Sequence, residues 1–282
     1  MHTLQPVTRP LQEEARAAWD SIADRFDQYV TPTNIALAET ALGRAGLQAG
    51  MRFLDVAAGS GALSLPAARQ GARVLATDLS PAMIERLRAR AREAGLSTLE
   101  ARVMDGHALD LQDDTFDIAG SQHGVSLFPD MARGLREMAR VTRPGGRVLV
   151  VALGPPTRAE FLGFFMSAIQ AVVPGFTGLP TDPPPLPFQV ANPESLRQAM
   201  AGAGLTGVRV EVASWDMAFH SGAHMWNVVT SSNPIGAGMV ADLTERQRVA
   251  VQGHLDGMLR QRSGGSGPAV LTNVVNIGIG TC

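Results

Sequence analysis

The sequence of 282 residues lacks lysine entirely, because all 24 of its basic residues are arginine. A phosphate-loop ATPase needs the lysine of its GxxxxGK[ST] motif. Schiff-base chemistry and the anchoring of pyridoxal phosphate need a lysine nucleophile. The composition therefore excludes these classes of enzyme.

Cysteine, long apolar runs and excess charge are also scarce. The only cysteine is Cys282, which excludes disulfides within the chain and cysteine-based zinc sites. No apolar run approaches the roughly 20 residues that a membrane span needs. A net charge of −2 argues against a nucleic-acid-binding surface. The first twenty residues do not read as a signal peptide, so we expect a cytoplasmic monomer or homodimer.

Apolar strands alternate with helices from Met51 onward. Ser80 and Pro81 form the N-cap and first turn of a helix that runs to about Ala94. Asp130 is the N-cap expected for another helix. The predicted strands are 53–57, 73–78, 99–105, 116–122 and 147–153. This alternation predicts an α/β fold with a parallel sheet and right-handed crossovers.

The flanking segments are mostly helical. Two helices are predicted over 12–30 and 33–45, and proline-rich sequence surrounds an apolar helix over 160–173. A short helix over 193–202 precedes a strand over 208–219, residues 221–262 are helical with a break at Asn233, and a last strand covers 269–280. We expect a single domain over 1–282, with a helical cap (1–47), a cofactor-binding core (48–153) and two substrate-lid insertions (154–195 and 220–265).

The first glycine turn, in RFLDVAAGSGALS, differs from a dinucleotide loop. The GxGxxG fingerprint places a pyrophosphate on a helix N-terminus, but here Gly59 and Gly61 are followed by Ser64 at the third position. Asp55 lies before the turn, where a carboxylate suits a cation better than a pyrophosphate. S-adenosylmethionine fits, because it carries an ammonium and no phosphate. A nicotinamide oxidoreductase is correspondingly disfavoured.

Two further acids end the next strands. Asp78 ends the second strand and is placed to accept hydrogen bonds from ribose hydroxyls, while Asp105 ends the third strand and is placed to meet an adenine amino group. Because open α/β sheets bind ligands at the carboxyl ends of their strands, the three acids predict one nucleoside-binding edge.

These segments together resemble a known family. LDVAAGSG, VLATDLSPAMI, VMDGHAL, FDIAGSQHGVSLFPD and LREMARVTRPGGRVLV occur in the order and spacing of class I S-adenosylmethionine-dependent methyltransferases, the broad group that includes the ubiquinone and menaquinone biosynthesis enzymes. The resemblance covers about residues 48–153. It implies a Rossmann-like seven-stranded sheet of order 3-2-1-4-5-7-6 with helices on both faces, a helical lid, and a last strand inserted antiparallel. Ala57 departs from the glycine usual in the family.

The resemblance also implies roles for individual residues toward S-adenosylmethionine, whose product is S-adenosylhomocysteine. The methionyl part would contact Asp55, Ala57, Gly59 and Gly61. The ribose would contact Asp78 and Leu79, and the adenine would contact Met83, Asp105, Gly106 and His107. The methyl group would face Ser121 and Gln122 at the end of the fourth strand. Simpler structural roles stay open for three of them. Asp55 could cap the turn, Met83 could be core, and His107 could contribute only its backbone.

Methyl transfer from a sulfonium is an in-line displacement, so positioning and exclusion of water matter most. A base is needed only when the acceptor must lose a proton. His123, after the fourth strand, is the candidate base, although it could be structural. Tyr29, on the N-terminal helical segment, is a second candidate for contact with cofactor or substrate.

The insertions carry a set of apolar side chains that suit a small-molecule pocket, unless they only seal the core: Phe161, Phe164, Phe165, Met166, Phe176, Trp215, Phe219, Met225 and Trp226. Phe165, His220, His224 and Trp226 are the candidate substrate contacts. No third ligand accompanies the two histidines in sequence, so no metal is expected. The predicted acceptor is small and largely apolar or aromatic, such as a quinone, an indole or another natural product. A cyclase that keeps S-adenosylmethionine as a structural ligand, or an inactive binding protein, is the alternative.

Overall fold

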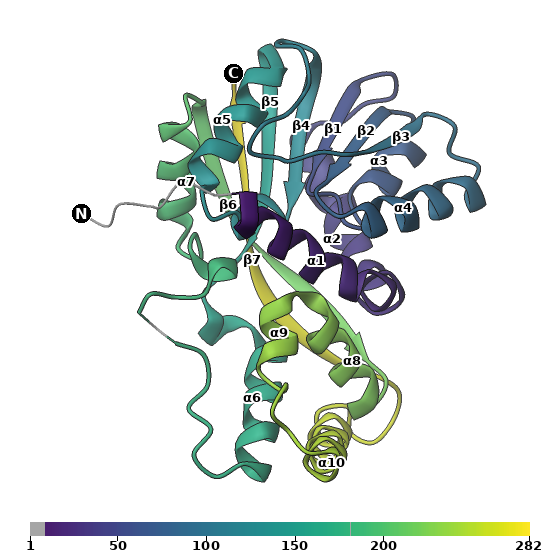
Figure 1. Cartoon of the computed structure of the whole chain (residues 1–282), viewed down its shortest axis with the longest axis vertical. Coiled ribbons are helices and arrows are strands. Elements are labelled where there is room, and N and C mark those ends of the chain that lie inside the picture. The colour runs from purple at the N-terminus through teal and green to yellow at the C-terminus, as the bar shows by residue number, and fades with distance from the viewer. Residues whose placement is uncertain (1–8, 181) are drawn as a thin grey trace.

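The computed structural model describes residues 9–180 and 182–282, so the first eight residues of the expected cap and residue 181 of the first insertion lie outside it. A seven-stranded sheet organises the chain, in the order β3-β2-β1-β4-β5-β7-β6 (Figure 1). The strands are β1 (Arg52–Val56), β2 (Arg73–Asp78), β3 (Leu99–Val103), β4 (Phe116–Gln122), β5 (Thr142–Leu153), β6 (Thr206–Phe219) and β7 (Ala269–Thr281).

The strand pairing confirms the predicted topology. The pairs β2–β3, β1–β2, β1–β4 and β4–β5 are parallel. β7 inserts antiparallel between β5 and β6. The parallel strands are rich in buried apolar residues, as expected when helices cover both faces of a sheet.

Helices pack on both faces of the sheet. α2 (Thr31–Ala45) and α3 (Ser64–Arg69) share one apolar cluster with Phe53 of β1, and α4 (Pro81–Glu93) packs on Ala76 of β2. On the opposite face, α5 (Met131–Val141) and α7 (Pro193–Gly202) cluster with Leu54 of β1. Neighbouring residues of β1 therefore point to opposite layers, which follows from the two-residue period of a strand.

The N-terminal helical segment differs from the prediction of two separate helices. α1 (Arg9–Arg25) passes into a π-helical turn (Phe26–Val30) and then directly into α2. The Thr31 N–H donates to the Phe26 carbonyl, one residue further back than in an α-helix. Pro32 follows at the start of α2 and has no N–H to donate to the preceding turn, which favours this wider turn over a continuous α-helix.

A second group of helices packs around one end of the long antiparallel pair β6–β7. Figure 1 shows α6 (Glu160–Val172), α8 (Gly222–Ser232), α9 (Pro234–Gly238) and α10 (Glu245–Arg262) below the main sheet, with β6 and β7 extending into them. α1 crosses between the two parts and contacts α4 on one side and α8 and α9 on the other. Short 3-10 turns occupy Val125–Leu127, Pro156–Arg158 and Leu186–Phe188.

Several strand boundaries differ from the prediction by one or two residues, and the start of β5 differs by five. β3 ends at Val103, so Asp105 lies in the loop after the strand rather than at its last position. β5 begins at Thr142, and its pairing with β4 shifts register between Phe116 and Ile118. The Pro144-Gly145-Gly146 sequence therefore forms an irregularity inside the strand where a separate turn was predicted.

Candidate active site

A cavity of about 380 Å³ lies along the carboxyl ends of the strands, at the edge where the sequence predicts ligand binding. Its size is within the range usual for small-molecule sites, roughly 300 to 1,000 Å³. The predicted site residues that line it are Asp55, Ala57, Gly59, Asp78, Leu79, Met83, Asp105, Gly106, His107, Gln122 and His123. The structure thus brings together side chains from β1, β2 and β4 and from the loop after β3.

Asp55 lies near the carboxyl end of β1, lines the cavity and is buried. One carboxylate oxygen accepts a hydrogen bond from the Ser64 hydroxyl, and the other oxygen, Oδ1, has no partner. Burial raises the pKa of Asp55 to about 7, opposed by the Ser64 hydrogen bond. Ser64, which stands where the dinucleotide fingerprint has its third glycine, therefore anchors the acid. A buried oxygen without a partner is a place for a cationic donor.

The glycine turn that follows Asp55 is hydrogen-bonded to Asp78. Ala57 has a φ of 56°, in the left-handed region that costs a residue with a Cβ about 1 kcal/mol. The Gly59 N–H donates to Asp78 Oδ2 at 2.8 Å, and the Ser80 N–H donates to Asp78 Oδ1 at 2.9 Å. Burial raises the pKa of Asp78 to about 6 in spite of these bonds. Each Asp78 oxygen keeps a further lone pair for a ligand hydroxyl.

Asp105 organises the loop after β3. Its Oδ1 accepts from the His107 backbone N–H and contacts His107 Nδ1, both at 2.9 Å. Burial acts to raise the pKa of Asp105, but these hydrogen bonds outweigh it and hold the pKa below its usual value. The His107 ring packs on Phe128, with centroids 4.5 Å apart, and its Nε2 is buried without a partner. A Cβ at Gly106 would lie 2.5 Å from Phe128, so this close packing requires glycine.

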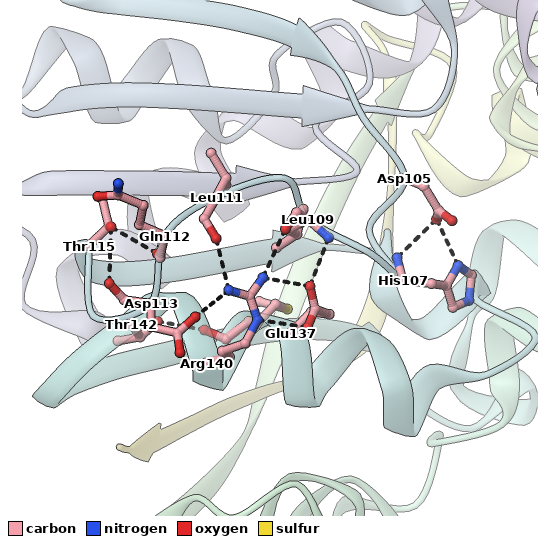
Figure 2. A network of polar contacts seen from close by, with 11 residues as sticks. Asp105, His107, Leu109, Leu111, Gln112, Asp113, Thr115, Glu137, Arg140 and Thr142 are labelled. Atoms are coloured by element: carbon pink, nitrogen blue, oxygen red, sulfur yellow. Dashed lines mark hydrogen bonds and ion pairs between the residues drawn. The ribbon is translucent and has the colours of Figure 1, made fainter.

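Arg140 of α5 fixes the rest of this loop, as Figure 2 shows. Its guanidinium donates to the carbonyls of Leu109 and Leu111 at 2.9 and 2.8 Å, and also binds Asp113 and Glu137. Glu137 in turn accepts from the Leu109 N–H. These carboxylates raise the pKa of Arg140 above its ordinary value, so the clamp is permanently charged. The segment that carries Asp105 is thereby tied to a helix of the core.

α1 covers the cavity from the N-terminal side. Ala15 and Trp19 of α1 line it, as does Phe26 of the following π-helical turn, and the Gln12 amide donates to Asp105 Oδ2 at 2.7 Å. Asp20 accepts hydrogen bonds at the start of α4, from the Ser80 hydroxyl at 2.5 Å and the Ala82 N–H at 3.1 Å. Two ion pairs, Asp24–Arg86 and Asp27–Arg90, continue the contact. The helix therefore covers one side of the cavity.

Gln122 and His123 lie at the end of β4. The Gln122 amide donates to the backbone and side-chain oxygens of Asn34 at 3.1 Å, which leaves its Oε1 without a partner. His123 has a φ of 56°, and both of its ring nitrogens are buried without partners. Burial lowers the pKa of His123 to about 4, so its ring is neutral at pH 7. Its ring lies against Trp215, with centroids 5.3 Å apart.

Two predicted cofactor residues and one predicted catalytic residue do not line the cavity. The Ser121 hydroxyl donates to the Val56 carbonyl and accepts from the Val125 N–H, both at 2.8 Å, so it holds the strand end together. A Cβ at Gly61 would lie 3.1 Å from Leu87, which indicates a packing role. Tyr29 packs against the apolar cluster around the lower helices, with its ring 6.4 Å from that of His224.

The four predicted substrate residues also lie away from the cavity. Phe165 is fully buried and packs on Trp226 with centroids 5.7 Å apart, in the core between α6 and α8. His220 is exposed, and its backbone N–H donates to His224 Nδ1 at 3.3 Å. Phe161 and Trp215, from the same set of apolar residues, do line the cavity, and the sequence pattern could not distinguish them from residues that only pack in the core.

Several lining residues had no assigned role at the sequence level. Gln12, Asn34, Phe128, Leu153, Pro187 and Asn233 line the cavity. They come from distant segments that only the fold brings together. Within the described residues, no group of three metal-ligating side chains is present and no helix is both long and apolar enough to cross a membrane.

Comparisons with known proteins agree with this geometry. A sequence profile for the methyltransferase domain matches residues 54–150. An uncharacterized protein of Mycobacterium tuberculosis (strain ATCC 25618 / H37Rv) is 38% identical over 179 residues, covering 62% of this chain and 62% of that protein. The chain thus spans less than two thirds of the length of that relative. Demethylmenaquinone methyltransferase of Mycobacterium sp. (strain KMS) is 31% identical over 210 residues, covering 72% of this chain and 85% of that enzyme.

A solved structure supports the same fold. Phosphoethanolamine N-methyltransferase 2 of Haemonchus contortus, in complex with S-adenosyl-L-methionine, superposes with a TM-score of 0.52 at 18% identity, over 87% of this chain and 52% of that chain. At this identity the likeness shows the fold alone. Together with the family profile, the 31% identity to a methyltransferase of which 85% is covered establishes the wider relationship. The chain belongs to the class I S-adenosylmethionine-dependent methyltransferases.

Proposed function

We propose that this chain transfers a methyl group from S-adenosylmethionine to a small, largely apolar or aromatic acceptor. The observation that carries the proposal is the buried, unpartnered Oδ1 of Asp55, in a cavity that Asp78 and Asp105 also line. An ammonium on the ligand would satisfy that oxygen. The proposal rests equally on the fit between three acids at neighbouring strand ends and a ligand with an ammonium, a ribose and an adenine.

Each group of residues has a distinct task. S-adenosylmethionine, when bound, supplies an electrophilic methyl group on a sulfonium sulfur. Asp55 would hold the ammonium, and the two Asp78 oxygens would accept from ribose hydroxyls. The loop of Asp105, Gly106 and His107, fixed by Arg140, would border the adenine. Met83 is buried yet lines the cavity, so it can pack on the ligand while remaining part of the core.

Positioning and exclusion of water would supply most of the rate enhancement. Ala15 and Trp19 of α1 and Phe26 of the π-helical turn line the cavity and would help to shield the reacting atoms. His123 is neutral and its two nitrogens are free, so it can accept a proton or a hydrogen bond from an acceptor that must be deprotonated. The large downward shift of its pKa makes His123 a weak base.

The proposal is tested by S-adenosylhomocysteine formation. Purified protein would be incubated with S-adenosylmethionine and a panel of reduced naphthoquinones, hydroxyindoles and phenols. We expect turnover with at least one of them, and loss of turnover in Asp78→Ala because the ribose contact is gone. Asp242→Ala, which changes an exposed acid, is the matched control and should leave turnover unchanged. Tight cofactor binding with no product from any acceptor would contradict transferase activity and favour the cyclase-like alternative.

A further inference from the structure

The cavity has two chemically different halves. The half beside β1, β2 and β3 contains the three carboxylates of Asp55, Asp78 and Asp105. The other half, which we call the β4–β6 half, is formed by His123, Leu153, Phe161, Pro187, Trp215 and Asn233, together with Gln122. The order of strands across the sheet separates these halves, since β4 and β5 follow β1 on the side away from β2 and β3.

The buried polar atoms without a partner in the β4–β6 half belong to two residues. The Trp215 indole N–H donates to the Thr33 carbonyl at 3.0 Å, and the Asn233 side-chain oxygen accepts from the Gly236 N–H at 3.0 Å. Gln122 Oε1, His123 Nδ1 and His123 Nε2 are buried and have no partner. Buried polar atoms without partners carry a desolvation cost, which a hydrogen bond from a bound ligand would relieve.

These free atoms define what a ligand must offer. Gln122 Oε1 only accepts, because a side-chain amide oxygen has lone pairs and no hydrogen. A neutral His123 ring offers one donor and one acceptor. A hydroxyl group both donates and accepts, so it can satisfy either residue, whereas a methyl ether or a bare ring cannot donate.

The lack of cationic side chains among the described residues of the β4–β6 half also restricts which ligands can bind there. Across the described part of the chain, no arginine lines the cavity, and the sequence contains no lysine at all. A carboxylate or phosphate on the acceptor would be buried beside apolar side chains, and none of the protein's described side chains there would supply a counter-cation, which is costly. The walls are aromatic instead: Phe161 lies edge-on to Trp215, with centroids 6.3 Å apart, and Trp215 is 7% exposed.

We propose that the β4–β6 half selects an uncharged, flat aromatic acceptor that bears a ring hydroxyl, with Gln122 and His123 as the specificity-determining residues and Trp215 as a packing wall. This inference rests on the proposed function, because it assigns the half opposite the carboxylates to the acceptor. The ring would pack against Trp215 and its hydroxyl would hydrogen-bond to the free atoms of the two polar residues.

The test uses three matched probes with one ring system: 2-naphthol, 2-methoxynaphthalene and 6-hydroxy-2-naphthoate. Each is titrated calorimetrically into the whole protein saturated with S-adenosylhomocysteine, whose uncharged sulfur does not attract the carboxylate probe. We expect 2-naphthol to bind at least tenfold tighter than either analogue. In His123→Phe, which keeps a ring against Trp215 and removes both nitrogens, the preference for 2-naphthol over 2-methoxynaphthalene should fall below threefold. His254→Phe, at an exposed position, is the control.

Each outcome decides the inference. Equal or tighter binding of the naphthoate, or of the methyl ether, would overturn it, as would no binding of 2-naphthol at all. The wild-type series decides without any variant, so misfolding of His123→Phe cannot rescue the proposal. S-adenosylhomocysteine binding is measured first: its failure would overturn the proposed function, whereas its success together with a wrong probe order would overturn only the choice of acceptor.

Discussion

Replacing Asp55 by asparagine should stabilise the free protein at alkaline pH while weakening ligand binding. The carboxyl is 1% exposed, and burial raises its pKa from 3.8 to about 7. Between these pH values the folded chain keeps a proton that the unfolded chain has released. Stability therefore falls as pH rises through this window, and the loss is complete above pH 7. The two pKa values differ by about three pH units. At 1.36 kcal/mol per unit, ionising the buried carboxyl lowers the free energy of unfolding by about 4 kcal/mol.

Asparagine has no such cost, because it does not ionise and its oxygen can still accept from the Ser64 hydroxyl. The free energy of unfolding of Asp55→Asn, relative to wild type, should rise by about 1.4 kcal/mol per pH unit between pH 5 and 7 and then level off. Urea unfolding at pH 5, 6, 7 and 8 measures it, with Asp242→Asn as an exposed control. If the difference in free energy of unfolding between Asp55→Asn and wild type does not change with pH, burial does not raise the pKa of Asp55 as described here.

Three further predictions follow from the same geometry. Because Asp55 must ionise to meet an ammonium, affinity for S-adenosylmethionine should rise roughly tenfold from pH 6 to pH 8, and a flat calorimetric profile would contradict this. Arg140→Lys cannot reproduce the guanidinium fork that holds two carbonyls, so stability should fall by about 1–3 kcal/mol and cofactor affinity several-fold; thermal unfolding and titration would detect it, and unchanged values would make the clamp irrelevant. Ala57→Gly relieves a left-handed φ but frees the unfolded chain, so unfolding energy should change by less than about 1 kcal/mol, whereas Ala57→Val should lose more than that; denaturant curves for both variants would show whether this ranking is reversed.

The fold was largely predictable because its signals are local. Ser80 and Asp130 accept from Met83 and Arg133 as N-caps, as their positions indicated. The alternation of strands and helices, together with the family resemblance, gave the strand order. The continuous α1–π–α2 segment was not predicted, because Pro32 indicates a helix start and carries no sign of whether the preceding helix breaks or widens.

The candidate site was predictable where residues end strands and unpredictable where the tertiary fold decides. Asp55 and Asp78 lie at the carboxyl edge because their strands are parallel neighbours. Gln12 reaches Asp105 across 93 positions of sequence, and no local pattern encodes that contact. Phe165 and Trp215 are both aromatic residues of the late segments and belong to one buried apolar cluster, yet only Trp215 also lines the cavity. Composition alone cannot tell which of these aromatic residues line the cavity.

The most direct measurement is calorimetric titration of the purified protein with S-adenosylmethionine, S-adenosylhomocysteine and NADH. The account predicts micromolar binding of the first two and no heat from NADH. The negative carboxylate of Asp55, beside the glycine turn, would repel the negatively charged pyrophosphate of NADH. Binding of NADH without binding of the sulfur compounds would contradict the central claim and show that Asp55 has a different role.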